Sequence, residues 1–406
     1  MITRVEATNF RCLKSVSQTL RPFQVLVGPN SSGKSAFLDA IDFLSDIVSS
    51  GLNQAVEWRT ENFHDLVWGR GGDSITLAIE AQMPEAVRAA EDARTIRYGI
   101  RIRLDGDTDQ LVIDRERLIT RSDAGQERPV LLREARRASF WDETGAGMYN
   151  LGGGALYDLD GGMYDLERAG MYNFELSSSY PGLANLPDDR TKFPAAVWLK
   201  ELMQGGVQLV DLRNDYLGGA SPPGQGQPRV YDGRNLARNV LQLSDSSDED
   251  YQAWLRHIQT ALPDVEAIRT VLRPEDRHRY LMVRYRNGIE VPSWMLSGGT
   301  LRLLALTLLA YIPNFRGVYL IEEPEIGLHP TAIETIVQSL SSVYSGQVLI
   351  TSHSPILLSL PEPRDLLCFQ RTDQGTEIIP GDRHPLLQDW RSGVSISDLF
   401  AAGVLG

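Results

Sequence analysis

Cysteine is nearly absent from the 406-residue sequence, which contains only Cys12 and Cys368. The two residues do not have the spacing of a metal site or of a redox pair. A disulfide framework and a cysteine zinc site are therefore excluded. We interpret both residues as ordinary thiols.

Long apolar runs are also missing. No uninterrupted run approaches the roughly 20 residues that a membrane helix needs. The first residues, "MITRVEATNF", carry charge, which is not the pattern of a signal peptide. We therefore expect a cytoplasmic protein without membrane contact. The apolar content of 42% is enough for a core, and the length allows two domains or one domain with a large insertion.

Lysine is scarce as well, and negative charge exceeds positive charge, with 53 Asp and Glu residues against 40 Lys and Arg residues. The net charge of −13 argues against a uniformly basic surface for nucleic acid. A local basic patch stays open, with the Arg-rich stretch from Arg115 to Arg137 as its best candidate. Its four Asp and Glu residues offset part of the charge of its seven Arg residues, so a solvated charged face is the other interpretation. Lysine occurs only at Lys14, Lys34, Lys192 and Lys200.

The N-terminal part has the pattern strand, glycine-containing loop and helix. The three segments are "FQVLVG", "PNSSGKS" and "AFLDAIDFLSDIVSS", the last with apolar residues at helical spacing. Two runs of period 2 follow, at residues 75–81 and 96–104, and predict half-buried antiparallel strands. We expect a β-rich flank beside the loop.

From about residue 125 to 280 the pattern loosens, which indicates an inserted lobe. Inside it the units "GMYN", "ALYD", "GMYD" and "GMYN" contain Tyr149, Tyr157, Tyr164 and Tyr172. Such units are typical of turn repeats that pack aromatic rings on one side, or of an exposed aromatic surface that stacks bases. Both interpretations stay open.

Helices are predicted at "AAVWLKELM" and "DEDYQAWLRHIQTAL", the latter with Ser247 as its N-cap. The segment "MVRYRNGIEVPSW" predicts a hairpin, because Asn287-Gly288 is the pair that a type I′ turn prefers. This hairpin leads directly into "LSGGTLRLLALTLLAYI".

The stretch "GPNSSGKS", residues 28–35, fits the pattern of a phosphate-binding loop between a strand and a helix. Backbone N–H groups of the loop can hold a β-phosphate, Lys34 can reach the β- and γ-phosphates, and the Ser35 hydroxyl can ligate Mg²⁺. We therefore expect ATP and Mg²⁺ as cofactors. The predicted nucleotide-binding residues of this loop are Gly28, Asn30, Ser31, Gly33, Lys34 and Ser35.

A P-loop protein also needs an acid at the end of a second apolar strand, to hold the metal or its water shell. The run "GVYLI" is such a strand, and Glu322 and Glu323 follow it. We interpret Glu322 as the acid on the Mg²⁺ side and Glu323 as the general base that orients and deprotonates the attacking water. The alternative is that both residues begin a solvated helix, which the preceding apolar residues disfavour.

Two further motifs complete the set. "LSGG", residues 296–299, precedes a helical run from Thr300 and offers a second anion site at a helix N-terminus. "VLITSHSP" is another apolar strand, and it ends at His353. A lone histidine is more often structural, but ligands bind at strand ends in open α/β sheets. We therefore predict that His353 senses the γ-phosphate.

The P-loop, LSGG, Glu-Glu strand end and strand-end histidine together resemble the ABC-type ATPases. The segments "NFRCLK", "LSGGTLRLLAL", "EEPEIGLHP" and "TSHSP" are similar to the SMC, RecF and OLD-like branch of that family. The resemblance implies an α/β fold, a P-loop NTPase of ABC ATPase type with a β-rich flank and a large inserted lobe. Residues 1–125 and 285–406 would form the two parts of the ATPase domain, and residues 126–284 the inserted α+β lobe.

The resemblance also implies a head-to-tail homodimer. ATP on one subunit's P-loop would be capped by Ser297, Gly298 and Gly299 of the other subunit. The loop of residues 325–329 would run along the dimer seam, and Arg11 would lie near the phosphates. One chain alone would then be a poor hydrolase.

The sequence departs from the family pattern in places. Glu322 stands where ABC proteins usually have aspartate, and this longer arm can place a water between carboxylate and metal. The region "NFHDLVWGRGG" has no Gln for a glutamine loop, and no heptad run suits a coiled-coil arm. OLD-like nucleases carry a C-terminal Toprim domain, for which the tail after His353 is too short. We therefore expect a stand-alone OLD-like AAA-family ATPase without its own nuclease site.

The expected function is Mg²⁺-dependent ATP binding and hydrolysis, with ATP-driven dimerisation that regulates DNA or an effector such as a separate nuclease. Anti-phage defence or DNA repair is the setting that the resemblance implies. The alternative is a nucleotide-gated scaffold or sensor for a partner protein, which hydrolyses ATP slowly or not at all. A transporter subunit is a third interpretation, which the large insertion and the "NFR" start do not suit.

Overall fold

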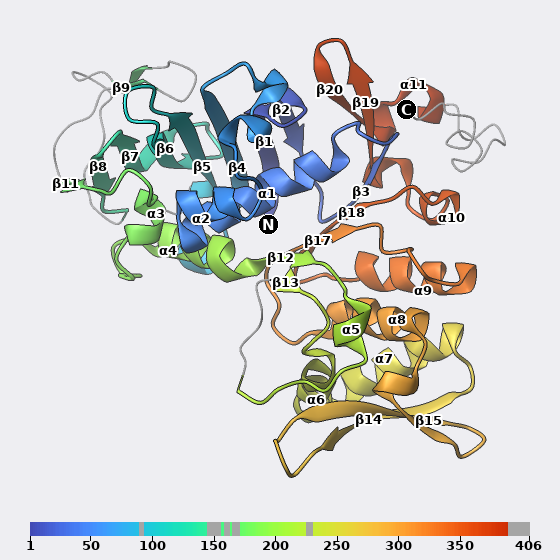
Figure 1. Cartoon of the computed structure of the whole chain (residues 1–406). Coiled ribbons are helices and arrows are strands. Elements are labelled where there is room, and N and C mark those ends of the chain that lie inside the picture. The colour runs from blue at the N-terminus through green and yellow to red at the C-terminus, as the bar shows by residue number, and fades with distance from the viewer. Residues whose placement is uncertain (89–92, 144–155, 158–162, 165–170, 225–229, 389–406) are drawn as a thin grey trace. The chain divides into compact units, whose positions relative to one another are not determined.

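The computed structural model describes residues 1–88, 93–143, 156–157, 163–164, 171–224 and 230–388 (Figure 1). The described residues form two compact units. Unit 1 contains those within 1–20, 30–207 and 370–378, and unit 2 those within 21–29, 208–369 and from 379 onward.

Unit 1 is built on an eight-stranded antiparallel sheet with the order β11-β8-β7-β6-β5-β4-β1-β2. Its strands are β1 (Ile2–Phe10), β2 (Leu13–Thr19), β4 (Ser74–Gln82), β5 (Ala93–Leu104), β6 (Leu111–Ser122), β7 (Glu127–Glu134), β8 (Arg137–Trp141) and β11 (Met171–Glu175). The predicted strands at 75–81 and 96–104 are confirmed. Their alternate side chains, such as Ile75 and Leu77 on β4 and Ile100 and Ile102 on β5, are buried, as a sheet with one face in a core requires.

Helices cover the sheet of unit 1. The helix after the P-loop packs against β1 and β4, and the next helix packs against β6. The helical elements of unit 1 are α1 (Lys34–Ser50), α2 (Leu52–Glu57), η1 (Phe63–Leu66), η2 (Trp68–Arg70), η3 (Glu85–Val87), α3 (Gly182–Asn185), α4 (Pro194–Glu201) and the π-helical turn η4 (Leu202–Gly206). The helix predicted at "AAVWLKELM" is therefore present as α4 and η4.

A second sheet, largely parallel, carries the core strands of unit 2. Its order is β13-β12-β17-β18-β3-β19-β20, and β17, β18, β3 and β19 are parallel neighbours. The strands are β3 (Phe23–Val27), β12 (Val207–Val210), β13 (Val230–Tyr231), β17 (Val318–Glu322), β18 (Gln347–Thr351), β19 (Leu366–Thr372) and β20 (Gly375–Pro380). The residues of β17 before Glu322 and all of β18 are buried, which explains their continuous apolar runs.

The helices α7, α8 and α9 pack against one another in unit 2 (Figure 1, yellow to orange). Trp254 of α7 is fully buried, and its indole N–H donates to the Thr307 hydroxyl of α8. Ser247 caps α7 by accepting from the backbone N–H of Asp250, as predicted. The helices are α5 (Asn214–Leu217), α6 (Leu236–Ser246), α7 (Asp248–Ala261), η5 (Ser293–Met295), α8 (Gly298–Leu308), η6 (Leu309–Tyr311), α9 (Pro330–Ser341), α10 (Pro355–Leu358), η7 (Pro363–Asp365), η8 (Gly381–Arg383) and α11 (Pro385–Gln388).

A three-stranded sheet, β14 (Val265–Leu272), β15 (Arg279–Tyr285) and β16 (Glu290–Pro292), packs on α6 and α7. The predicted hairpin is confirmed by the pairing of β15 with β16, but the prediction of a type I′ turn is wrong. Gly288 has φ 82°, whereas Asn287 is not among the residues with positive φ, and a type I′ turn needs positive φ at both central residues. The Gly288 N–H donates to Tyr285 O, and Asn287 instead accepts from the Ile289 N–H through its side chain.

The observed units divide the chain differently from the expected segments. The described residues within 126–207 belong to unit 1, because β7 and β8 continue its antiparallel sheet beyond β6. Those within 208–284 belong to unit 2, since α6 and α7 pack against α8 and β14. The described residues of the expected lobe, 126–284, therefore do not form one separate unit but belong in part to unit 1 and in part to unit 2.

The tyrosine units fall in a region that the structure describes in part. Tyr149 lies outside the described residues. Tyr157 and Tyr164 lie in the paired strands β9 (Leu156–Tyr157) and β10 (Met163–Tyr164), and Tyr172 lies in β11. Three of the units therefore contribute short strands, and base stacking by them stays a prediction.

Among the described residues, no helix combines the length and apolarity needed to cross a membrane.

Candidate functional site

The phosphate-binding pattern lies between β3 and α1, as predicted. Ser31 and Gly33 have positive φ values of 61° and 110°, and backbones that alternate in this way turn successive N–H groups into an anion-binding concavity. Helix α1 begins at Lys34 and has no acidic residue in its first turn, so its N-terminal N–H groups favour an anion. Lys34 is buried and Ser35 is exposed.

A distant threonine braces this loop within unit 1. The Thr376 hydroxyl lies 2.9 Å from Ser32 O and 3.3 Å from Cys12 O, so it can donate to one of them at a time. A Cβ added at Gly33 would come within 2.6 Å of the Thr376 hydroxyl oxygen. Glycine is thus needed at position 33 both for its φ and for the close approach.

Arg11 lies against α1. Its guanidinium forms a 2.7 Å ion pair with Asp39, one turn beyond Ser35. Asp39 also pairs with the buried Arg59, which contacts Asp42 and Asp46 on the same helix face. This network attaches Arg11 to the helix that follows the phosphate-binding loop. A contact of Arg11 with phosphates stays a prediction.

The acidic strand end in unit 2 lies beside the end of β3. Glu322 pairs in register with Thr351 of β18, and Thr351 pairs with Leu26 of β3. The carboxyl ends of three neighbouring parallel strands therefore meet at one sheet edge, where open α/β sheets bind ligands. The apolar residues of β17 are buried, but Glu322 is exposed. This exposure removes the desolvation cost that a buried carboxylate would carry.

Glu323 has a strained backbone at this edge. Its φ is 45°, a left-handed value that is uncommon outside glycine and asparagine, and its N–H donates to Thr351 O at 3.0 Å. The His353 Nε2 atom lies 3.8 Å from the Glu323 Oε1 atom. This distance is too long for a hydrogen bond, but it brings the two predicted catalytic side chains to the same end of β17 and β18.

The LSGG segment begins α8 at Gly298, two residues before the predicted start. The Ser297 hydroxyl oxygen caps the helix by accepting from the Thr300 N–H at 3.1 Å. A Cβ at Gly299 would lie 2.8 Å from Gly327 O, so only glycine fits there without a shift. Ser297 is exposed, and Gly298 lies against Asn214.

The structure therefore groups the predicted residues in three places. Glu322, Glu323 and His353 share the sheet edge with Gly28, which directly follows β3. Residues 30–35 form the loop and the start of α1, with Arg11 attached to that helix. Residues 297–299 form the start of α8. The roles of Thr376, Arg59 and Glu325 were not predicted from the sequence, because each side chain contacts residues that are distant in sequence.

The Arg-rich stretch from Arg115 to Arg137 forms much of β6 and β7. Arg117 and Arg133 are buried, Arg133 lies 3.6 Å from the fully buried Glu116, and Arg121 pairs with Glu127. Three of these arginines are thus buried or ion-paired within unit 1, which disfavours a basic patch along the whole stretch. Because two of them are buried, the stretch is not a uniformly solvated charged face either.

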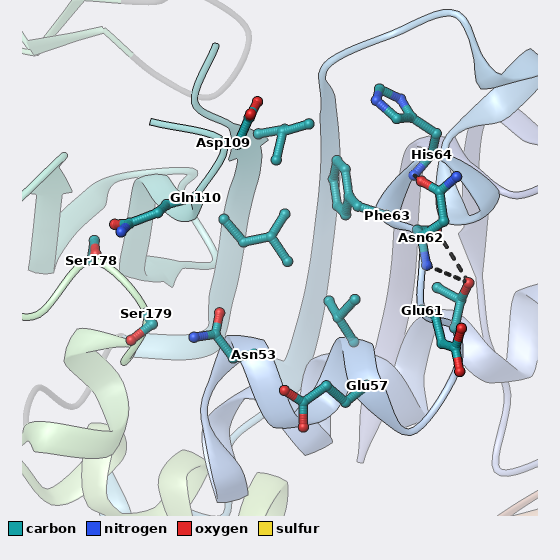
Figure 2. A pocket seen from close by; sticks show the side chains of 14 residues that line it. Asn53, Glu57, Glu61, Asn62, Phe63, His64, Asp109, Gln110, Ser178 and Ser179 are labelled. Carbon is teal, nitrogen blue, oxygen red and sulfur yellow. Dashed lines mark hydrogen bonds between the residues drawn. The ribbon is translucent and has the colours of Figure 1, made fainter. Parts of the chain in front are cut away.

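A polar pocket of about 640 Å³ lies in unit 1, separate from the predicted residues (Figure 2). Asn53 and Glu57 of α2 form one wall, and Gln110 and Ser178 lie opposite Phe63 (Figure 2). Its charged lining residues are Glu57, Glu61 and Asp109. Such a lining repels phosphate, so this pocket is not the nucleotide site.

Oxygen ligands suit Mg²⁺, and the chain offers them at the Ser35 hydroxyl and the Glu322 carboxylate. Within the parts of the chain that the structure describes, no cluster of three or more His, Cys, Asp or Glu side chains suits a metal ion. The buried Ser32 hydroxyl oxygen also has no hydrogen-bond partner among the described residues. The loop therefore retains donor capacity that fits a phosphate group.

These features define an ABC-type ATPase of the SMC and OLD-like branch. The chain belongs to the family described as "AAA domain, putative AbiEii toxin, Type IV TA system", whose sequence profile matches residues 23–359. The predicted recognition as an SMC- and OLD-like ATPase and the predicted α/β P-loop fold are confirmed. The absence of a Toprim domain stays a prediction.

Among curated proteins, the Old nuclease of Escherichia phage P2 is 20% identical over 390 residues, which cover 92% of this chain and 60% of that protein. The OLD nuclease of Thermus scotoductus is 43% identical over 44 residues, which cover 11% of this chain and 8% of that protein. The chain thus spans less than two thirds of the length of either nuclease.

Among solved structures, an SMC head bound to the C-winged helix domain of ScpA is similar, with a TM-score of 0.52 and 12% identity. The match covers 93% of this chain and 96% of that one. At this identity the likeness shows the fold alone.

Proposed function

We propose that this protein binds ATP with Mg²⁺, hydrolyses it, and dimerises on ATP to control an effector or DNA. The observation that carries the proposal is the shared edge of β3, β18 and β17, where the start of the P-loop, Glu322, Glu323 and His353 meet. P-loop proteins need the phosphate loop, an acid at the metal and a group that orients the attacking water close together.

Each group has a distinct role in the proposed site. The loop N–H groups and Lys34 bind the phosphates, and Ser35 and Glu322 hold the metal. When bound, Mg²⁺ neutralises charge on the phosphate oxygens. Glu323 orients the attacking water and accepts its proton, and His353 contacts the γ-phosphate.

The start of α8 would complete the site in trans. Ser297 is exposed at a helix N-terminus, and Gly298 and Gly299 bring no side chain between the helix backbone and an approaching phosphate. We propose that these residues cap the ATP of a second copy of the chain. The dimer then forms only with ATP bound, so nucleotide state sets the oligomeric state.

The relatives motivate the biological setting. One is named Old nuclease and another OLD nuclease, and the family description mentions a toxin. We propose that closure of the dimer controls such an effector, in anti-phage defence or in DNA repair.

The test compares wild type with Glu323→Gln and with Glu362→Gln, a control at an exposed carboxylate paired with Arg364. ATP turnover and light scattering with and without ATP and Mg²⁺ are measured. Loss of the general base should lower turnover by about 100-fold or more and leave a stable ATP-bound dimer, whereas the control should behave as wild type.

Three results would contradict parts of the proposal. Binding of ATP without turnover in any variant would favour a nucleotide-gated scaffold or sensor. Turnover by a protein that stays monomeric would overturn the dimer. Absence of ATP binding would overturn the proposed site.

A further inference from the structure

One carboxylate joins the loop after β17 to the loop that carries His353. The Glu325 Oε1 atom accepts hydrogen bonds from the Ser352 hydroxyl at 2.6 Å, from His353 N at 3.1 Å and from Ser354 N at 3.2 Å. All four residues belong to unit 2. Three donors on one oxygen is an unusual concentration, and bonds to a charged acceptor are stronger than neutral ones.

These bonds act on the backbone on both sides of the histidine. Because the N–H groups of His353 and Ser354 both point at Glu325, the two peptide planes that flank the His353 Cα are held. The direction in which the imidazole leaves the chain follows from those planes. Ser352 is fully buried, and its hydroxyl also accepts from Ser354 N at 3.0 Å. Residues 352–354 are therefore held by this bond as well as by the bonds to Glu325.

The carboxylate is itself held by a rigid turn. Ile326 N donates to Glu323 O at 3.1 Å, and Leu328 N donates to Glu325 O at 3.1 Å. Gly327 has φ 76°, and its carbonyl is the group that excludes a Cβ at Gly299. The turn that carries Glu325 is therefore fixed at Glu323 on one side and against the start of α8 on the other.

We propose that Glu325 is a positioning residue that aims His353 at the γ-phosphate and thereby sets the preference for ATP over ADP. This inference rests on the proposed function of the site. It assigns to Glu325 a role within one subunit, in addition to the position on the dimer seam that the family resemblance implies for its loop.

The test uses the full chain and measures affinity for a non-hydrolysable ATP analogue and for ADP, each with Mg²⁺, by titration calorimetry. The variants are Glu325→Ala, Glu325→Gln, His353→Ala and the double variant Glu325→Ala with His353→Ala. Glu334→Gln is the control, because this exposed glutamate of α9 accepts a bond from Gln338 in its own helix and lies outside the proposed site. Thermal unfolding checks that each variant folds.

We expect Glu325→Ala to lower the ratio of analogue to ADP affinity by about tenfold, since it removes an acceptor shared by three donors. Glu325→Gln retains an acceptor oxygen but loses the charge, so its effect should be about threefold. The double variant should lower the ratio no further than His353→Ala, because Glu325 acts through His353. The control should keep the wild-type ratio.

The outcomes distinguish a failure of the proposed function from a failure of the proposed role of Glu325. Wild type that binds neither nucleotide would overturn the proposed function and this inference with it. Wild type that prefers the ATP analogue, with an unchanged ratio in Glu325→Ala or with additive effects in the double variant, would overturn the inference alone. If Glu325→Ala does not fold, the ratio in the milder Glu325→Gln decides.

Discussion

The helices α1 and α8 both begin in glycine-rich segments, but their N-termini are satisfied differently. At α1 the N-cap is Gly33, and no side chain caps the helix. At α8 the N-cap is Ser297, whose hydroxyl oxygen accepts from Thr300 N. An uncapped N-terminus needs another acceptor for its N–H groups. The comparison agrees with our proposal that α1 binds an external anion, whereas the Thr300 N–H of α8 already has an acceptor within the chain.

A third helix start sharpens this contrast. The Glu143 carboxylate accepts from Ala195 N at 3.1 Å and from Ala196 N at 2.9 Å, at the beginning of α4. A protein carboxylate thus occupies at α4 the place that we propose for phosphate at α1. Two of the helices thus show two ways to satisfy the same orphan N–H groups, through the N-cap residue at α8 and through an acid distant in sequence at α4. A bound phosphate would be a third way, which we propose for α1.

The largest expected effect comes from Lys34→Ala at the open helix start. Loss of a buried charge that bonds phosphate should weaken ATP and ADP binding by about 100-fold. Lys192→Ala is the control, because this lysine lies over the Tyr172 ring in unit 1 and outside the predicted site. Nucleotide titration measures both variants. Equal affinities in the two would remove the reason to treat α1 as the anion site.

The second-largest expected effect is a loss of stability at the start of α8, which should leave the role of α1 unchanged. Gly299→Ala brings a Cβ to 2.8 Å from Gly327 O, a backbone atom, whereas in Gly298→Ala the nearest atoms belong to the Asn214 side chain, at 3.3 Å. We expect Gly299→Ala to destabilise the fold by about 2 kcal/mol, as overpacking does, and Gly298→Ala to cost less. Urea unfolding gives both values.

Nucleotide titration of the same two variants supplies the functional half of that experiment. Binding to the monomer should persist in both, because neither substitution alters the P-loop. A loss of monomer binding in Gly299→Ala would contradict the assignment of α1 and α8 to separate roles.

The smallest expected effect concerns α4 and pH. Burial raises the pKa of Glu143 from 4.5 to about 7, although the two helix N–H groups act in the opposite direction. Since the folded pKa lies above the unfolded one, the folded state holds the proton more tightly. Stability from this group is therefore present below about pH 4.5 and is lost as pH rises towards 7.

A shift of that size would carry roughly 3 kcal/mol, and we expect about 1.5 kcal/mol because Glu143 is only partly buried, so water can reach the carboxylate. Urea unfolding at pH 5 and pH 8 should show this loss in wild type and not in Glu143→Gln. The same pH dependence in both proteins would show that the α4 capping carboxylate keeps an ordinary pKa.

The sequence predicted the elements that flank the local motifs. The P-loop pattern predicted the order β3, loop and α1, and the apolar run before Glu322 predicted a buried strand with its acid at the end. These predictions hold because helix and strand periodicity and loop glycines are properties of neighbouring residues. The hairpin at Asn287-Gly288 shows the limit: the pair predicted a turn, but strand register selected another turn type.

The sequence by itself determined the family, the main elements and the candidate chemistry, because each of these depends on residues a few positions apart. Only the tertiary structure decided that Thr376 braces Ser32 across 344 positions, that Glu325 holds the loop of His353, and that Arg117 and Arg133 are buried within a sheet. The tertiary structure also places the described residues within 126–284 in two different units. Such contacts arise when the packing of whole sheets brings distant segments together, and the chain carries no local pattern for them.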